Sequence, residues 1–147
     1  MTKLLLIDGS NYLFRAYHAL PPLTTSSGEP TGAIKGFHAM LRNVYSKIAP
    51  DYVACVFDAH AKTFRHTIYP EYKANRPPMP EDLRVQLEPI RQMVKFLGWP
   101  LLQIEGVEAD DVLATLACRA SAEGIEAFIA TGDKDLAQVV TENISLV

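Results

Sequence analysis

Three short apolar runs, each followed closely by an acidic residue, are the feature of this sequence that most limits its fold. The runs are Leu4–Ile7 before Asp8, Tyr52–Phe57 before Asp58, and Ala127–Thr131 before Gly132 and Asp133. Apolar runs of this length, bounded by polar residues or turns, are typical of strands buried on both faces of a parallel sheet. Two weaker candidates, at Leu101–Ile104 and Ile144–Val147, would extend that sheet.

The segments between these runs have a helical pattern. Apolar residues recur at helical spacing from Ile34 to Ile48 and from Leu83 to Leu97. The second pattern stops before Gly98, and Pro89 inside it predicts a kink. Alternating strands and helices predict an α/β fold with three layers, in which helices cover both faces of a mainly parallel sheet. In such folds, ligands bind beyond the carboxyl ends of the strands.

Length and composition indicate one soluble domain. The chain has 147 residues, of which 48% are apolar, so we expect a single folding unit over residues 1–147. No apolar run approaches the roughly 20 residues that span a bilayer, and the N-terminus turns polar too early for a signal peptide. We therefore expect a cytoplasmic protein with no membrane partner. The net charge of −3 does not indicate a nucleic-acid binder, so the distribution of charge must decide.

Seven acidic residues are expected to gather at the carboxyl edge of the sheet, three of them at the start of a helix. They are Asp8, Asp58, Glu108, Asp110, Asp111, Asp133 and Asp135. Each has an alternative role, because acids cap helices and complement the helix dipole. For Asp8 or Asp135 alone, capping explains the residue equally well. As a set, however, they would repel one another unless protons or cations neutralised them, which predicts a metal site.

The ligand types indicate which metal. Carboxylate oxygens suit Mg²⁺ or Mn²⁺, whereas zinc prefers histidine and cysteine, which are not clustered in this sequence. Two such ions about 4 Å apart can generate a hydroxide from water and stabilise an in-line phosphoryl displacement. The acids therefore predict metal-dependent phosphodiester hydrolysis without a side-chain nucleophile.

Residues 59–80 form a cationic and aromatic segment in an acidic protein, and they resist assignment to a regular element. Lysines and arginines alternate there with rings: Lys62, Phe64, Arg65, Tyr69, Tyr72, Lys73 and Arg76. Single-stranded nucleic acid needs both countercharge and stacking surfaces, so this segment predicts a strand-binding region. A solvated surface loop is the alternative. Arg15 is a further candidate phosphate contact, although an ordinary surface arginine would look the same.

Four segments, in order, match a known family: DGSNYLFRAYHALPPLTTSSGEPTGA, FDAHAKTFRHTIYPEYKANRPPMPEDLRVQ, GVEADDVLATLA and TGDKDLAQVV. Through them the chain resembles, almost end to end, the 5′ nuclease domain of bacterial DNA polymerase I, which belongs to the PIN-like 5′ nucleases. The resemblance implies a Rossmann-like fold and a Mg²⁺- or Mn²⁺-dependent 5′-3′ exonuclease and 5′ flap endonuclease of DNA replication and repair. Its partners would be flapped, nicked or forked DNA and RNA primers on DNA.

The resemblance also assigns roles to residues. All seven acids match metal ligands of the family, and Asp111 is also counted among the catalytic residues. The family's arch over the site corresponds to residues 59–80, where Arg65, Tyr72, Lys73 and Arg76 match contacts to the substrate. Lys73 and Arg76 would stabilise charge on the transferred phosphate, Tyr72 would stack on the terminal base, and Arg15 would contact a phosphate.

The family pattern continues beyond Val147, with further acids and a helical region that grips duplex DNA. We therefore expect a truncated domain that can belong to a parent chain with a polymerase domain. A catalytically inactive fragment, acting only as a DNA-binding or folded module, is the alternative function. A phosphatase of the haloacid dehalogenase type is disfavoured, because the first strand is followed by Asp8, Gly9 and Ser10 instead of a DxD motif.

Overall fold

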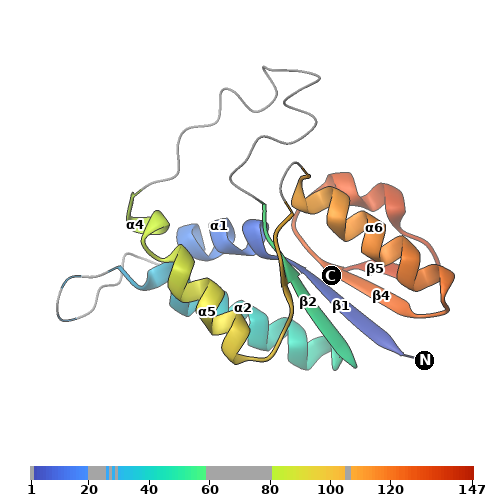
Figure 1. Ribbon diagram of the computed structural model, residues 1–147, viewed down its shortest axis with the longest axis horizontal. Coiled ribbons are helices and arrows are strands. Elements are labelled where there is room, and N and C mark those ends of the chain that lie inside the picture. Colours follow the sequence, from blue (N-terminus) through green and yellow to red (C-terminus); the bar gives the residue numbers. More distant parts are fainter. Residues whose placement is uncertain (1, 20–25, 27, 29, 59–80, 105–106) are drawn as a thin grey trace, which may run out of the picture.

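Five parallel strands form a single sheet in the computed structural model, which describes residues 2–19, 26, 28, 30–58, 81–104 and 107–147. The strand order is β3-β2-β1-β4-β5, and Figure 1 shows β1 between β2 and β4. The strands are β1 Lys3–Asp8, β2 Tyr52–Val56, β3 Leu101–Leu102, β4 Glu126–Ala130 and β5 Ile144–Leu146. Register is parallel throughout, since β1 pairs with both β2 and β4 and the outer strands continue in the same direction. The expected parallel α/β sheet is confirmed, with β3 shorter than predicted.

Helices connect the strands and cover both faces of the sheet. They are α1 Gly9–Ala19, α2 Gly32–Ile48, α4 Glu81–Arg84, α5 Leu87–Phe96 and α6 Ala109–Ala122, followed by the 3₁₀ helix η1 Lys134–Val139. Alternation along the strands divides the core. Leu5 and Ile7 face the cluster beneath α1, α2 and α5, whereas Leu6 faces the cluster beneath α6. The sheet is therefore buried on both sides, as its apolar runs predicted.

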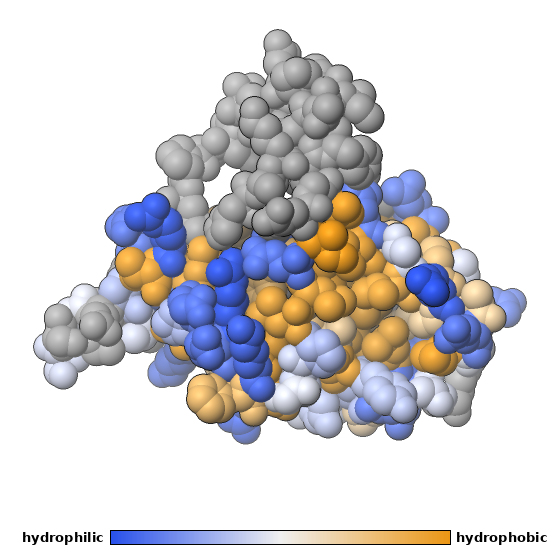
Figure 2. All heavy atoms as spheres, in the orientation of Figure 1, coloured by the Kyte–Doolittle hydropathy of each residue, from blue (hydrophilic) through white to orange (hydrophobic). Residues whose placement is uncertain are grey.

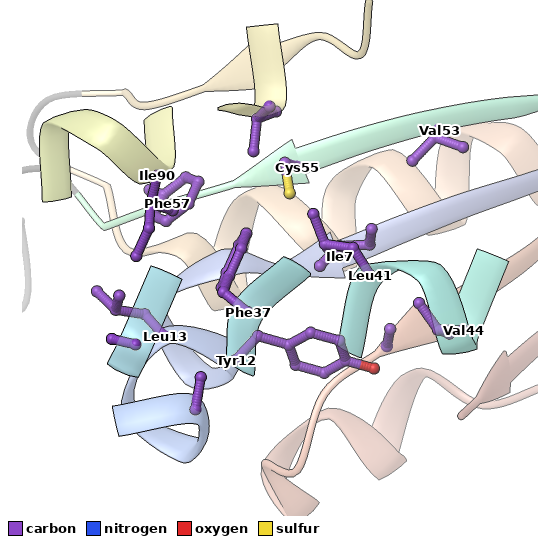
Figure 3. Packing of buried hydrophobic residues seen from close by; sticks show 14 of the residues in the cluster. Ile7, Tyr12, Leu13, Phe37, Leu41, Val44, Val53, Cys55, Phe57 and Ile90 are labelled. Atoms are coloured by element: carbon purple, nitrogen blue, oxygen red, sulfur yellow. The ribbon is translucent and has the colours of Figure 1, made fainter. Parts of the chain in front are cut away.

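The larger core cluster fixes the end of β2. Phe37 of α2 stacks on Phe57, with ring centroids 6.0 Å apart, and both rings are buried (Figure 3). Phe57 also lies against Gly9, where an added Cβ would stand 2.7 Å from its ring. The start of α1 and the residue before Asp58 are thus held together by close packing.

Pro89 disturbs this helical segment as predicted, but as a break between two helices and not as a kink within one. α4 ends at Arg84 and α5 begins at Leu87, so the break includes Val85, whose carbonyl an N–H at position 89 would have bonded. Buried Gln86 stabilises the break: its Nε2 donates to the Asp82 carbonyl (2.7 Å) and its Oε1 accepts from the Ile34 N–H (3.0 Å). Pro89 consequently lies in the first turn of α5, where its missing N–H has no intrahelical partner to lose.

The surface is mixed in character. Figure 2 shows apolar side chains gathered over the middle of one face, between α5 and α6, with hydrophilic residues on either side. Ile104, which follows the short edge strand β3, is 48% exposed. Within the described ranges, no helix combines the length and apolar character needed to cross a membrane.

The strand order places a crevice next to β1. The chain runs from β1 outward through β2 and β3, and α6 then returns it to the other side of β1 as β4. The connections of β1 and β4 therefore leave the sheet in opposite directions. Ligands of open α/β sheets bind at such a switch point, beyond the carboxyl ends of the strands.

Candidate metal centre

Four of the predicted acids line one cavity at this switch point. Its volume is about 150 Å³, and the described residues that line it are Asp8, Ser10, Asn11, Phe14, Asp58, Asp110 and Asp133. These residues come from the end of β1, the first turns of α1, the segment after β2, the start of α6 and the turn after β4. Parallel pairing brings these distant segments together, because every strand ends at the same edge.

Asp8 is buried and held at both oxygens. Its side chain is 3% exposed; Oδ1 accepts from the Asn11 N–H (3.2 Å) and Oδ2 from the Thr131 hydroxyl (2.8 Å). Burial raises the pKa of Asp8, and these two hydrogen bonds partly oppose the rise. The bond to Asn11 caps the first turn of α1. Capping and lining the cavity are therefore both roles of Asp8, not alternatives.

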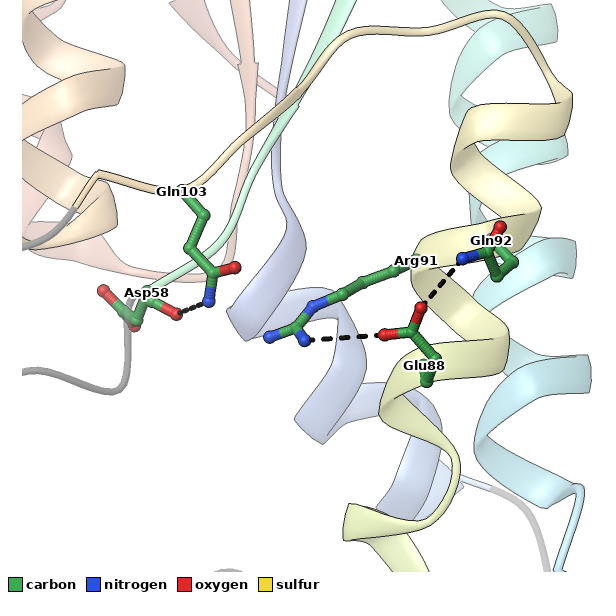
Figure 4. Close-up of polar contacts among 5 residues, drawn as sticks. All are labelled: Asp58, Glu88, Arg91, Gln92 and Gln103. Atoms are coloured by element: carbon green, nitrogen blue, oxygen red, sulfur yellow. Dashed lines mark hydrogen bonds and ion pairs between the residues drawn. The ribbon is translucent and has the colours of Figure 1, made fainter.

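Asp58 is exposed and anchored in a different way. Its N–H donates to Ser10 Oγ (2.8 Å), and its carbonyl accepts from Gln103 Nε2 (2.9 Å; Figure 4). Its Oδ1 accepts from the N–H of Ala109, the first residue of α6, at 2.7 Å. Asp58 therefore ties the end of β2 to the start of α6. Figure 4 also shows an ion pair along α5, in which Arg91 Nη1 lies 3.8 Å from Glu88 Oε2.

Asp110 has a raised pKa, because it is partly buried and lies among other acidic residues. Partial burial, a hydrogen bond with Asp133 and the charges of Asp8, Asp133 and Asp58 raise the pKa of Asp110 to about 7. A hydrogen bond between two carboxyl groups requires a proton on one of them. Below a pH of about 7, Asp110 and Asp133 therefore share a proton, which a cation bound in the cavity would displace.

The donor set fits a hard divalent cation. Among the residues that the structure describes, no three or more His, Cys, Asp or Glu side chains stand close enough together to hold an ion. Mg²⁺ keeps several waters and takes only one or two carboxylates from a protein, so it does not need such a cage. The four carboxylates around this cavity can supply the one or two protein ligands that Mg²⁺ takes, and the raised pKa of Asp110, about 7, reflects the crowding of negative charge that a cation would relieve.

The remaining predicted ligands are placed differently. Glu108 is buried at the N-cap of α6, where its backbone is extended (φ −75°, ψ 153°). Asp111 is partly exposed and follows Asp110 on α6, but it is not among the described residues of the cavity wall. Successive helical residues point about 100° apart, so the two neighbours do not share a direction. The side chain of Asp135 lies outside the described residues.

The predicted substrate contacts lie mostly outside the described residues. Arg65, Tyr72, Lys73 and Arg76 all belong to residues 59–80, which are not described. Arg15 is exposed on α1, and its guanidinium carbon lies 5.4 Å from the centroid of the Tyr12 ring. Its side chain also approaches Gly132, since an added Cβ there would stand 3.7 Å from Arg15 Cδ. Arg15 is thus close to the turn that carries Asp133.

The polar residues that hold the acids in place were not predicted from the sequence. Ser10, Asn11, Gln103 and Thr131 each hydrogen-bond to Asp8, to Asp58 or to the turn after β4. A buried carboxylate needs donors, and this requirement would have indicated Asn11, in the first turn after β1, and Thr131, which follows β4. Gln103 has no comparable signal, because its contact depends on how β3 leaves the sheet.

Comparison with known proteins identifies the family. Residues 3–147 match the 5′-3′ exonuclease N-terminal resolvase-like domain. The chain is 56% identical over 144 residues to DNA polymerase I of Pseudomonas aeruginosa, covering 98% of this chain and 16% of that protein. It is 47% identical to the 5′-3′ exonuclease of Aquifex aeolicus, covering all of this chain and 51% of that protein. The chain thus spans about half, or less, of the length of these relatives.

Solved structures support the fold. T5 5′-exonuclease with bound zinc ions superposes with a TM-score of 0.71 at 21% identity, covering 98% of this chain and 54% of that one. The catalytic core of Rad2 in complex with DNA gives a TM-score of 0.53 at 16% identity, covering 92% of this chain and 40% of that one. The fold is therefore that of the 5′ nucleases, and the chain belongs to the 5′-3′ exonuclease family through its N-terminal resolvase-like domain.

Proposed function

We propose that this chain is the catalytic part of a metal-dependent 5′ nuclease, which hydrolyses phosphodiester bonds at or near the 5′ end of a nucleic-acid strand. The observation that supports this most strongly is the meeting of Asp8, Asp58, Asp110 and Asp133 at one cavity of the switch-point crevice. The meeting of four carboxylates at one cavity favours hydrolysis over the alternative of an inactive DNA-binding module. The function of the 5′-3′ exonuclease relatives agrees with this proposal.

The cofactor in this proposal is Mg²⁺ or Mn²⁺, with two ions in the complete domain. The four cavity carboxylates would hold them, with Glu108, Asp111 and Asp135 as further ligands. When bound, the ions would activate water and neutralise charge on the scissile phosphate. Zinc occupies the T5 5′-exonuclease structure, but the described donors here are oxygens, which suit a harder ion.

The protein's own residues would supply position and charge. Asp8 would present its carboxylate in a defined orientation, because both of its oxygens accept hydrogen bonds. Asp110 would give up its proton when a cation binds, because its raised pKa comes from burial and from neighbouring acids. Arg15, next to the Gly132 turn, would contact a phosphate. Arg65, Tyr72, Lys73 and Arg76 keep their proposed roles, with Lys73 and Arg76 stabilising the reacting phosphate and Tyr72 stacking on the terminal base.

The proposed substrates are DNA with a 5′ flap, nick or fork, and RNA primers on DNA. Rad2 is bound to DNA in its solved structure, which agrees with a DNA substrate for this fold. Because one relative is a DNA polymerase I, a polymerase domain in the same parent chain and a cytoplasmic, nucleoid-associated location are part of the proposal.

A labelled 5′-flap duplex mixed with Mg²⁺ tests the function directly. The chain, alone or continued to the length of its Aquifex relative, should release short 5′ fragments, and chelation should stop the release. Asp110→Asn should abolish cleavage. Asp51→Asn is the matched control, since Asp51 accepts a hydrogen bond from Lys3 N–H at the opposite edge of the sheet (2.8 Å) and should leave cleavage unchanged.

Two outcomes would contradict the proposal. If both lengths of chain bind flap DNA normally but cleave none of it, the inactive-module alternative is correct. If Asp110→Asn and Asp51→Asn cleave equally well, the cavity is not the active site. Small phosphomonoesters should remain intact, because a nuclease needs the strand on both sides of the bond.

A further inference from the structure

The turn after β4 is tied to β1 and α1 by three hydrogen bonds. The Thr131 hydroxyl donates to Asp8 Oδ2 (2.8 Å), the Gly132 N–H donates to Asn11 Oδ1 (2.9 Å), and the Asp133 N–H donates to Thr131 Oγ1 (3.0 Å). An added Cβ at Gly132 would stand only 3.2 Å from Asn11 Oδ1, so the turn lies close against α1. The positions of Asp8 and Asp133 are therefore set by the same few atoms.

Thr131 occupies the centre of this arrangement. It is 8% exposed, so solvent does not compete for its hydroxyl. A backbone N–H can only donate, so the bond from Asp133 uses an oxygen lone pair of Thr131. The single hydroxyl proton is thereby left for Asp8, which fixes the direction of that bond. One oxygen atom consequently orients the carboxylate of one strand end and the backbone of the other.

We propose that Thr131 is a positioning residue for the divalent cation, because its hydroxyl holds Asp8 and the Asp133 backbone in the geometry that receives the ion. This inference rests on the proposed nuclease function, since it assumes that these carboxylates bind metal. Thr131 is not among the described residues that line the cavity, so its proposed role does not involve contact with the ion or the reacting phosphate. It acts through Asp8, in the way that outer hydrogen bonds orient the ligands of metal sites.

Metal binding to three variants of the chain tests this proposal. Calorimetric titration with Mn²⁺ and Mg²⁺ measures affinity without requiring cleavage. Thr131→Val keeps the side-chain shape but removes the hydroxyl, and it should weaken binding about 10-fold or more. Thr131→Ser keeps the hydroxyl, and its affinity for the ions should lie within about 3-fold of that of the unsubstituted chain. Thr131→Ala differs from Thr131→Ser only by the oxygen, so this pair still gives the comparison if Thr131→Val does not fold.

A control variant separates positioning by Thr131 from a general loss of stability. Val44→Ala destabilises the core beneath α2, where Val44 is 5% exposed, and should leave the metal affinity unchanged. Equal binding by Thr131→Ser and Thr131→Ala, both folded by circular dichroism, would overturn the positioning role while leaving the metal site intact. Failure of the parent chain itself to bind either ion would instead overturn the proposed function.

Discussion

The ends of β1 and β2 hold their carboxylates in opposite ways. At the β1 end, Asp8 is 3% exposed and both of its oxygens accept hydrogen bonds. At the β2 end, Asp58 is exposed, and its backbone and one carboxylate oxygen are used to join β2 to α6. We call these the buried side and the exposed side of the site. The difference teaches that a carboxylate can be fixed by burying it or by making it part of the chain's own connections.

The largest difference between the two sides should be in catalysis. Asp8→Asn keeps the shape of the side chain but removes the charge that the cavity holds most rigidly, so flap cleavage should fall about 10³-fold. Asp58→Asn should cost less, about 10-fold to 100-fold, because water around the exposed side chain screens the charge that is lost. Single-turnover rates at saturating Mg²⁺ measure both. A larger loss for Asp58→Asn would reverse the comparison.

Stability should respond to these substitutions in the opposite direction from activity. Asp8→Asn removes a buried charge, so its free energy of unfolding at pH 8 in the absence of metal should equal or exceed that of the parent chain. Urea denaturation measures this value. Marked destabilisation would show that the Asp8 charge is needed by the fold itself.

The stability of the metal-free chain should depend on pH, because the pKa of Asp110 differs between the folded and the unfolded state. Burial, the hydrogen bond with Asp133 and the neighbouring charges raise the folded pKa of Asp110 to about 7, above its value in the unfolded chain. The folded state therefore binds more protons, and the resulting stability is present below about pH 4 and is lost as pH rises through about 7. Saturating Mg²⁺ should reduce this loss, and it should bind more weakly at pH 6 than at pH 8.

The pKa of Asp110 should also distinguish the buried side from the exposed side. Among the charges acting on Asp110, that of Asp8 contributes more than that of Asp58. Asp8→Asn should therefore lower the pKa of Asp110 more than Asp58→Asn does, as followed by carboxyl carbon NMR. Equal shifts would indicate that burial of Asp8 does not strengthen its interaction with Asp110.

Replacing a glycine next to each side by alanine should give a smaller difference between the two sides, seen as a loss of stability. A Cβ at Gly9 would stand 2.7 Å from the buried Phe57 ring, which precedes Asp58, whereas a Cβ at Gly132 would stand 3.2 Å from the end of the Asn11 side chain. Gly9→Ala should therefore cost about 1–3 kcal/mol of stability, and Gly132→Ala less. Thermal unfolding measures both. The reverse order would mean that the Phe57 ring moves easily.

The smallest effect is expected for Gln103→Ala. This change removes one hydrogen bond to the Asp58 carbonyl, which lies on the exposed side and can bond to water instead. The loss of stability should be about 0.5–1.5 kcal/mol. Denaturant midpoints measure it, and a cost above about 3 kcal/mol would show that the exposed side is as rigidly held as the buried one.

Much of the fold and part of the site could be predicted from the sequence. Apolar runs with acids at their ends predicted strands whose carboxyl ends meet, and parallel pairing brings Asp8, Asp58, Asp110 and Asp133 to one cavity. Pro89 predicted that the helix is disturbed, but the contact of Gln86 that stabilises the break could not be predicted, because its partner Ile34 lies on another helix. Thr131 was predicted only as the last residue of a strand, although the need of a buried carboxylate for donors indicates it as a partner of Asp8.

Calorimetric titration of Mg²⁺ into the metal-free chain at a pH of about 7, where Asp110 is still partly protonated, tests most directly whether this cavity is a metal centre. We predict saturable binding with proton release, abolished by Asp8→Asn, weakened by Asp58→Asn and unchanged by Asp51→Asn. Absence of binding, or equal affinity in Asp8→Asn and the parent chain, would contradict the assignment of the cavity as a metal centre.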